Sequence, residues 1–225
     1  MQNKTSLPAA IIIGAIIIGG AVYYSKNAKK GGEKTEPRKQ ASYLVPENSH
    51  FLGNPDAEIT MVEFSDTECP FCKRFHGTMK QIMDEYGKEG KVKWVYRHLP
   101  LDALHSKSRK EAEATECAAE AGGNDMFWKY VNRLYEITPS NNRLDPSELS
   151  KIAEFAGLDV GKFEECLDSG RMAERVEKDY QAGVKAGVRG TPHTIIMNKK
   201  GDRSTINGAQ PYPQVKSAID ALLAK

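Results

Sequence analysis

The sequence predicts an α/β domain that carries an all-helical insertion and follows an apolar N-terminal segment. Three observations support this prediction: a β-α-β pattern over residues 58–98, a helical pattern from about residue 105 to 187, and a β-β-α pattern over residues 194–223. With 225 residues, the chain can form one good-sized core together with an insertion. We therefore expect one folded domain over residues 49–225.

The first elements follow from their residue patterns. Residues 58–64 form a short apolar and β-branched run, which predicts a buried strand that ends in a turn before Cys69. After Cys72, apolar side chains recur at three- and four-residue steps until Gly87 stops the pattern, which predicts a helix. A second strand is expected over residues 92–98.

The rest of the chain changes from helical to strand patterns. In the insertion we expect one helix that includes Ala121, a separate helix that includes Phe127, and further helices separated by proline and glycine residues. Residues 194–197 and 204–206 then predict two short strands joined by a tight turn. A last amphipathic helix is expected over residues 212–223.

Residues 7–24 form an uncharged apolar run that follows a short tail, residues 1–6. As a helix this run would span about 27 Å, close to the ~30 Å hydrocarbon core of a bilayer. A cleaved signal peptide is the alternative, but Lys26 stands where cleavage after Ala28 would need a small residue. We therefore expect an uncleaved transmembrane anchor. The lysines after the run favour a cytoplasmic domain by the positive-inside rule, but the cysteine chemistry described below outweighs them.

Residues 25–48 are rich in lysine and glycine and nearly free of large apolar side chains, which predicts a flexible polar tether. Over the whole chain, 32 lysine and arginine residues nearly balance 30 aspartate and glutamate residues. Because these charges are scattered, nothing calls for a nucleic-acid partner. The five histidines lack a metal-binding spacing such as a helical i, i+4 pair, so we expect no metal.

The strongest functional signal is the pair Cys69 and Cys72, separated by Pro70 and Phe71 at the predicted strand-to-helix turn. Two sulfurs on one helical turn can form a short disulfide that is easily reduced. Unpaired N–H groups and the dipole at the start of a helix stabilise a thiolate, so Cys69 should be reactive near neutral pH. Pro70 suits the first helical position because it has no N–H group.

Half of a zinc site, completed by Cys117 and Cys166, is the alternative interpretation of this pair. Zinc sites of that type usually draw on two close-spaced pairs. Cys117 and Cys166 lie far apart on separate predicted helices, so a redox-active pair is favoured.

Glu63 is a carboxylate in the middle of the apolar strand that leads to Cys69. Buried carboxylates usually have a raised pKa, so a buried Glu63 beneath the active-site helix would be a proton acceptor or relay for the cysteines. Alternatively, the alternation of the strand turns the Glu63 side chain to solvent.

Together with these residues, several short motifs resemble the DsbA-like branch of the thioredoxin superfamily, which includes DsbA- and BdbD-type proteins. The motifs are residues 63–66 (Glu-Phe-Ser-Asp), 69–72 (Cys-Pro-Phe-Cys), 97–101 (Arg-His-Leu-Pro-Leu), His105, Cys117-Ala118, Phe163, Cys166-Leu167 and 188–192 (Val-Arg-Gly-Thr-Pro). The resemblance extends from about residue 48 to the C-terminus. It implies a thioredoxin-like fold with a helical insertion, and thiol-disulfide exchange without an external cofactor.

By this resemblance, Cys69 is the exposed nucleophile and Cys72 the resolving thiol. Pro192 is then a cis-proline packed over the disulfide, preceded by Thr191, and the backbone beside it would pair with a bound peptide as a strand does. Phe71 replaces the histidine often found between the cysteines of the strongest oxidants, which tempers the expected oxidising power.

Cys117 and Cys166 lie on predicted helices of the insertion. In an oxidising compartment, two nearby buried thiols would normally be joined, and a bridge that closes about fifty residues would stabilise the fold by roughly 4 kcal/mol. We prefer this structural disulfide to the alternative of two free core cysteines.

The functional hypothesis is disulfide exchange on unfolded or partly folded exported proteins, outside the cytoplasm, with reoxidation by a membrane quinone-linked thiol oxidase. Isomerases of this type generally carry an N-terminal dimerisation domain, for which residues 25–48 are too short and too polar, so a monomer is expected. The alternatives are a protein disulfide reductase or isomerase, and a non-enzymatic chaperone module that binds peptides with the helical insertion.

Overall fold

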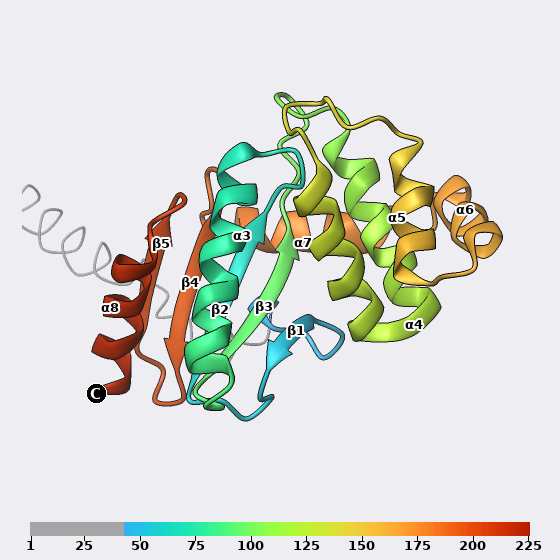
Figure 1. The fold of residues 1–225 in the computed structure, drawn as a ribbon. Coiled ribbons are helices and arrows are strands. Elements are labelled where there is room, and N and C mark those ends of the chain that lie inside the picture. The colour runs from blue at the N-terminus through green and yellow to red at the C-terminus, as the bar shows by residue number, and fades with distance from the viewer. Residues whose placement is uncertain (1–42) are drawn as a thin grey trace, which may run out of the picture. The chain divides into compact units, whose positions relative to one another are not determined.

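The computed structural model describes residues 43–225. The expected tail and anchor, residues 1–24, and most of the expected tether lie outside the described residues. Within residues 43–225, no helix is both long and apolar enough to cross a membrane. The described part contains a five-stranded sheet, helices that cover it, and a helical insertion (Figure 1).

The sheet has the strand order β1-β3-β2-β4-β5. Strand β2 (Ile59–Ser65) runs parallel to β3 (Val92–His98), whereas β1 (His50–Gly53), β4 (His193–Asn198) and β5 (Arg203–Asn207) pair antiparallel with their neighbours. Helix α3 (Pro70–Ile82), extended by the π-helical turn η1 (Met83–Gly87), provides the crossover that the parallel pair needs. The sequence did not predict β1, because four residues are too few to show an alternating pattern.

The insertion contains α4 (Ser108–Ile137), α5 (Glu148–Ala156), α6 (Val160–Ser169) and α7 (Ala173–Lys185), and helix α8 (Tyr212–Leu223) follows the last strand. Helix α4 is kinked at Gly122 and Gly123, whose backbone angles are not helical. The kink lies between Ala121 and Phe127, where the sequence predicted two separate helices.

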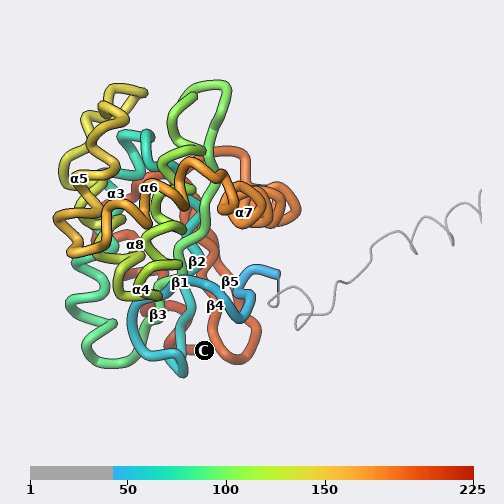
Figure 2. Tube along the Cα trace, turned by 90° about the vertical axis from the view of Figure 1, so that its right-hand side faces the viewer, coloured from blue at the N-terminus to red at the C-terminus, as the bar shows by residue number. Residues whose placement is uncertain are grey.

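Alternation along β2 sends its side chains to opposite faces of the sheet. Met61 packs in the core under α3 and α8, whereas Val62 and Phe64 pack in the core on the side of α7. Figures 1 and 2 show α3 and α8 on one side of the sheet and α7 on the other. Glu63 and Ser65 share the face of Met61, so both lie beneath the helix that begins at the cysteine pair.

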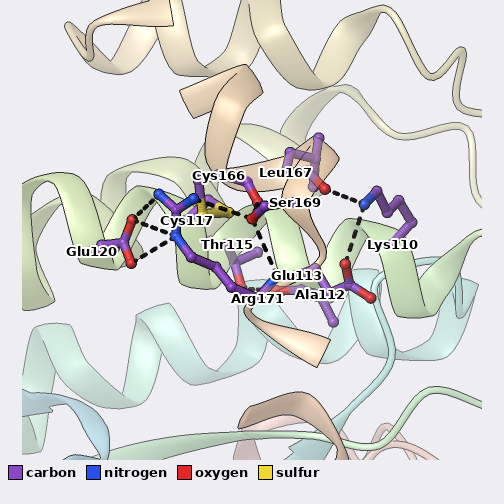
Figure 3. Close-up of a disulfide and its surroundings, with 10 residues drawn as sticks. All are labelled: Lys110, Ala112, Glu113, Thr115, Cys117, Glu120, Cys166, Leu167, Ser169 and Arg171. Atoms are coloured by element: carbon purple, nitrogen blue, oxygen red, sulfur yellow. Dashed lines mark hydrogen bonds and ion pairs between the residues drawn. A yellow bond between two sulfur atoms is a disulfide. The ribbon is translucent and has the colours of Figure 1, made fainter. Parts of the chain in front are cut away.

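The insertion has a core of its own, which contains Cys117 of α4 and Cys166 of α6. A disulfide joins these two residues, with their Cα atoms 5.8 Å apart (Figure 3). Beside it, Arg171 binds the carboxylate of Glu120 through two nitrogens. The bridge therefore ties the first half of α4 to α6 within the insertion.

Residues 43–48, which the sequence assigned to the tether, pack on the domain. Leu44 is 1% exposed and belongs to the core on the side of α7. Arg97 donates hydrogen bonds to the backbone carbonyls of Tyr43 and Leu44, at 3.0 and 2.7 Å. The tether was predicted to extend to residue 48, but the residues from 43 on already pack on the domain. One buried leucine beside a lysine-rich stretch produces no periodic pattern, so the sequence did not show this.

Candidate active site

The cysteine pair lies where β2 passes into α3. Cys69 is the residue before the first turn of α3, Pro70 occupies the first helical position, and Cys72 lies in that turn. The Lys73 N–H donates to the Cys69 carbonyl at 3.0 Å and closes the first helical hydrogen bond. The start of the helix is thus directed at Cys69, where its dipole favours a negative charge.

Both cysteine residues are buried, with Cys69 3% and Cys72 0% exposed. The expectation of an exposed nucleophile at Cys69 was therefore wrong for this structure. The reason is the loop before β4, because the carbonyl oxygen of Thr191 lies 3.6 Å from the sulfur of Cys69 and accepts its S–H when Cys69 is protonated.

The two thiols differ in acidity. The hydrogen bond from Cys72, supported by backbone N–H groups and Thr191, lowers the pKa of Cys69 from 9.0 to about 6, although burial opposes it. Burial, followed by the interaction with Cys69, raises the pKa of Cys72 well above its ordinary value. At neutral pH the pair therefore consists of a thiolate on Cys69 beside a thiol on Cys72.

The loop that covers Cys69 contains a cis peptide bond between Thr191 and Pro192. It leads into β4, which pairs with β2 so that His193 lies opposite Phe64. On its outer side, Arg189, Thr191 and His193 help to line a cavity of about 330 Å³. The residue before Pro192 thus contacts Cys69, and the Thr191-Pro192 bond is cis.

Glu63 is fully buried, which excludes the alternative of a side chain turned to solvent. Neither of its carboxyl oxygens has a hydrogen-bond partner of normal geometry. Burial raises the pKa of Glu63 from 4.5 to about 7, while Ser65 and Trp94 oppose this rise. Near neutral pH this carboxyl group can therefore both give and take a proton.

Three buried hydroxyl groups lie next to Glu63, and sequence reasoning did not assign them a role. The Tyr135 hydroxyl of α4 is 2.9 Å from the hydroxyls of both Ser65 and Tyr96. Ser65 could have been found, because it follows Glu63 by two positions and shares its face of the strand. Tyr135 could not, since the kinked helix α4 brings it to the sheet through tertiary packing.

The turn before Cys69 is held by Asp66 and Glu68. Asp66 accepts the Leu101 N–H at 2.7 Å, contacts the His105 ring at 3.0 Å and accepts the Glu68 N–H at 2.8 Å. The Glu68 carboxylate accepts the Asn142 N–H at 2.6 Å. Two loops of the insertion are thereby fixed against the segment that carries the reactive cysteine.

Among residues 43–225, one cluster has the ligand types of a metal site: His98, Glu116 and Asp179, with one atom of each within 4.8 Å of the others. Its carboxylates are already paired, Glu116 with His50 and Asp179 with Arg97. Burial disfavours the charge of Glu116, but hydrogen bonds from His50 and His98 hold its pKa well below the usual range. We therefore interpret the cluster as an ion-pair network.

Comparison with known proteins places this site in a family. The family model described as "Thioredoxin" matches residues 46–221. The chain belongs to the thioredoxin family. DsbA2 from Pseudomonas aeruginosa has a similar solved structure, with 27% identity, a TM-score of 0.64, and coverage of 79% of this chain and 96% of that one. Oxidised BdbD from Bacillus subtilis gives 27% identity, a TM-score of 0.71, and coverage of 80% and 96%.

These neighbours confirm the thioredoxin-like fold with its helical insertion and the resemblance to DsbA- and BdbD-type proteins. Thiol-disulfide oxidoreductases of this fold use a redox-active cysteine pair and no external cofactor. In this chain the described cysteines that remain free are Cys69 and Cys72, because Cys117 and Cys166 are bonded to each other. The chain therefore has the free cysteine pair that thiol-disulfide exchange in this fold requires.

Two curated relatives are Na(+)/H(+) antiporters. NhaA 3 from Salinispora tropica is 33% identical over 155 residues, and NhaA from Herminiimonas arsenicoxydans is 31% identical over 183 residues. These matches cover 69% and 80% of this chain but 22% and 28% of the relatives. The chain thus spans about a quarter of their length, and the similarity concerns one segment of those larger proteins.

Proposed function

We propose that this protein introduces or exchanges disulfides in exported proteins through Cys69 and Cys72. The observation that carries the proposal is the free cysteine pair at the start of α3, with Cys69 just before the helix and Cys72 in its first turn. The opposite shifts of the two pKa values, with Cys69 lowered to about 6 and Cys72 raised, agree with this placement. A thiolate that is stable on the first cysteine is a good leaving group and favours the reduced pair. The disulfide form then acts as an oxidant.

In the proposed reaction, a substrate thiolate attacks the Cys69 sulfur of the Cys69–Cys72 disulfide. A mixed disulfide forms, and the Cys72 sulfur leaves with the electron pair and takes up a proton. A second substrate thiolate then attacks the substrate sulfur of the mixed disulfide and releases Cys69 as a thiolate. Two substrate thiols are oxidised and the enzyme pair is reduced.

Two groups beside the pair support this reaction. The backbone next to Thr191 and Pro192 would hold an unfolded substrate segment in strand fashion, because this backbone lies against Cys69. Glu63 would exchange the proton of Cys72, because its pKa of about 7 suits both directions of transfer.

The proposed setting is outside the cytoplasm, with residues 7–24 as an uncleaved anchor and a membrane quinone-linked thiol oxidase that reoxidises a monomeric enzyme. A membrane-impermeant thiol reagent should label reduced Cys69 in intact cells. Labelling that appears only after lysis would contradict this topology. N-terminal sequencing that starts near Lys29 would contradict the anchor.

Redox titration against glutathione tests the direction of the reaction. We expect a reduction potential clearly above the roughly −270 mV of thioredoxin. A value near that of thioredoxin would favour the reductase or isomerase alternative. The variant Cys72→Ala should accumulate mixed disulfides through Cys69, whereas Cys69→Ala should abolish exchange. If Cys69→Ala/Cys72→Ala keeps full activity on unfolded proteins, the protein is a binding module.

A further inference from the structure

A line of buried hydroxyl groups lies beneath Cys72 and joins three elements of the fold. Ser65 comes from β2, Tyr96 from β3 and Tyr135 from α4, and the Tyr135 oxygen is 2.9 Å from each of the other two. All three side chains are at most 3% exposed. Buried hydroxyls that bond to one another can reorient their protons without moving heavy atoms.

Ser65 lies on the same face of β2 as Glu63 and precedes Asp66, whose N–H lies close to the Cys72 sulfur. Its hydroxyl interacts with the Glu63 carboxyl and with the Cys72 sulfur, and it lowers the pKa of both. Lowering both pKa values means that Ser65 donates to whichever partner is the anion. A single hydroxyl can therefore donate to the Glu63 carboxylate or to the Cys72 thiolate.

Tyr135 fixes Ser65 in this position. Its hydroxyl also reaches the Asp66 carbonyl at 3.3 Å, and the Asp66 N–H lies 3.4 Å from the Cys72 sulfur. Tyr135 is thereby attached to the same turn as Cys72. Tyr135 has one hydroxyl proton, which it donates either to the Asp66 carbonyl or to the Ser65 oxygen. When it donates to Ser65, the proton of Ser65 is free to point toward Glu63 or Cys72.

The groups that face Glu63 come from every element packed around it. They are Ser65 of β2, Trp94 and Tyr96 of β3, Tyr135 of α4 and Thr194, which lies opposite Glu63 on β4. His76 of α3 packs against the rings of Trp94 and Tyr135. Burial lowers the pKa of His76 to about 4, so this ring is neutral at pH 7. The charge of Glu63 thus depends on burial and on hydroxyl partners.

We propose that Ser65, positioned by Tyr135 of the helical insertion, carries the proton between Cys72 and Glu63. This inference rests on the proposed function and adds two residues to its chemistry. It also gives the insertion a part in the redox step, because Tyr135 belongs to α4.

The step is written here for a mixed disulfide between Cys69 and glutathione. The Cys72 thiol passes its proton to the Ser65 oxygen while the Ser65 proton passes to the Glu63 carboxylate. The Cys72 sulfur attacks the Cys69 sulfur, forms the Cys69–Cys72 bond and breaks the bond to glutathione. Glutathione leaves with the electron pair as a thiolate and is protonated by solvent, so the cysteine pair is oxidised and glutathione is reduced. Substrate oxidation uses the same path in reverse.

The test measures this step in the full-length protein. Reduced protein is mixed with oxidised glutathione, the reaction is quenched with acid, and the decay of the mixed disulfide is followed by mass at several pH values. The wild-type rate should show an inflection near pH 7, from Glu63. Ser65→Ala should slow the step at least about tenfold at pH 7 and remove the inflection. Ser65→Thr, which keeps the hydroxyl, should restore both.

Tyr135→Phe should lose part of the rate and weaken the same inflection. Tyr130→Phe is the matched control, because its hydroxyl lies on the same helix, is buried and donates to the Leu149 carbonyl at 2.9 Å, inside the insertion. This control should keep the wild-type profile. If Ser65→Ala does not fold, the relay is tested by comparing the pH profiles of Tyr135→Phe and Tyr130→Phe.

An unchanged pH profile in Ser65→Ala would overturn the relay, and an unchanged profile in Tyr135→Phe would overturn the role of the insertion. In both cases the wild-type protein still exchanges with glutathione, so the proposed function stands. If the wild-type protein forms no mixed disulfide at all, the proposed function fails and the relay fails with it.

Discussion

The Nε atom of Arg97 lies 2.7 Å from a carboxylate oxygen of Asp179, and the two side chains are only 2% and 1% exposed. Asp179 also accepts the His98 N–H at 3.1 Å, while Arg97 donates to the backbone at Leu44. This ion pair joins β3 to α7 on the face of the sheet opposite to α3. It also holds the segment that enters the domain.

Asp179→Ala should lower the free energy of unfolding by about 3–5 kcal/mol, because it leaves the Arg97 charge buried without its partner. Urea unfolding of the oxidised protein measures this loss. Glu174→Ala is the matched control on the same helix, since Glu174 pairs with Lys178 at 2.7 Å where both side chains are mostly exposed. The control should cost less than about 1 kcal/mol. Equal costs for the two variants would contradict the importance of the buried pair.

Glu63→Gln should stabilise the oxidised protein in a pH-dependent way. The folded-state pKa of Glu63 is about 7 against an ordinary 4.5. A raised pKa means that stability is complete below about pH 4.5, falls as the pH rises toward 7, and then levels off. The variant should therefore gain about 3 kcal/mol above pH 7 and little at pH 4. A gain of the same size at both pH values would point to packing and not to ionisation.

Cys72→Ala should raise the pKa of Cys69. The largest contribution to the low value of about 6 is the hydrogen bond from Cys72, and alanine removes it. Thiolate absorbance in the ultraviolet, followed against pH, gives the titration midpoint of Cys69 in the wild-type protein and in the variant. A midpoint near 6 in the variant would show that the backbone N–H groups at the start of α3 suffice without Cys72.

Phe71→His should lower the pKa of Cys69 further and make the pair more oxidising. Phe71 is 53% exposed, and the Arg74 guanidinium lies 5.2 Å from the centre of its ring. A histidine ring at this position can donate a hydrogen bond or carry a positive charge next to the Cys69 thiolate. The pKa of Cys69 should fall, and the equilibrium with glutathione should shift toward the reduced cysteine pair. Phe71→Leu, which adds no polar group, should leave both near the wild-type values.

The double variant Cys117→Ala/Cys166→Ala should lower the free energy of unfolding by about 4 kcal/mol. The bridge lies in the insertion core, and both residues are 1% exposed. Graded reduction of the wild-type protein should therefore open Cys69–Cys72 first and leave Cys117–Cys166 bonded. Alkylation of Cys117 in native protein without reductant would show that the bridge is absent in solution.

Much of the fold could be predicted from the sequence, because its main signals are local. The apolar run at residues 58–64, the helical period after Cys72 and the turn residues Pro70 and Gly87 each describe their own segment. These signals correctly placed the cysteine pair at the junction between β2 and α3. The helical period of the insertion likewise depends on neighbouring residues alone.

The remaining features depend on packing between distant segments. Thr191 covers Cys69, and Tyr135 reaches Ser65, only because β4 and α4 meet at the same junction. Leu44 packs in the core on the side of α7, and Arg97 holds its carbonyl. No periodic pattern in one segment records such contacts, which is why the exposure of Cys69 and the start of the domain were predicted wrongly.

The position of β4 beside β2 also has a consequence for folding during synthesis, because β4 comes late in the sequence. The Thr191 carbonyl that covers Cys69 is synthesised after all four cysteines. A growing chain therefore passes through a stage in which Cys69 is uncovered while Cys117 and Cys166 are already present. The insertion core, which holds Cys117 and Cys166 together in the folded protein, lies entirely before β4 in the sequence. The order of synthesis thus lets the protein close its own bridge before its reactive site is complete.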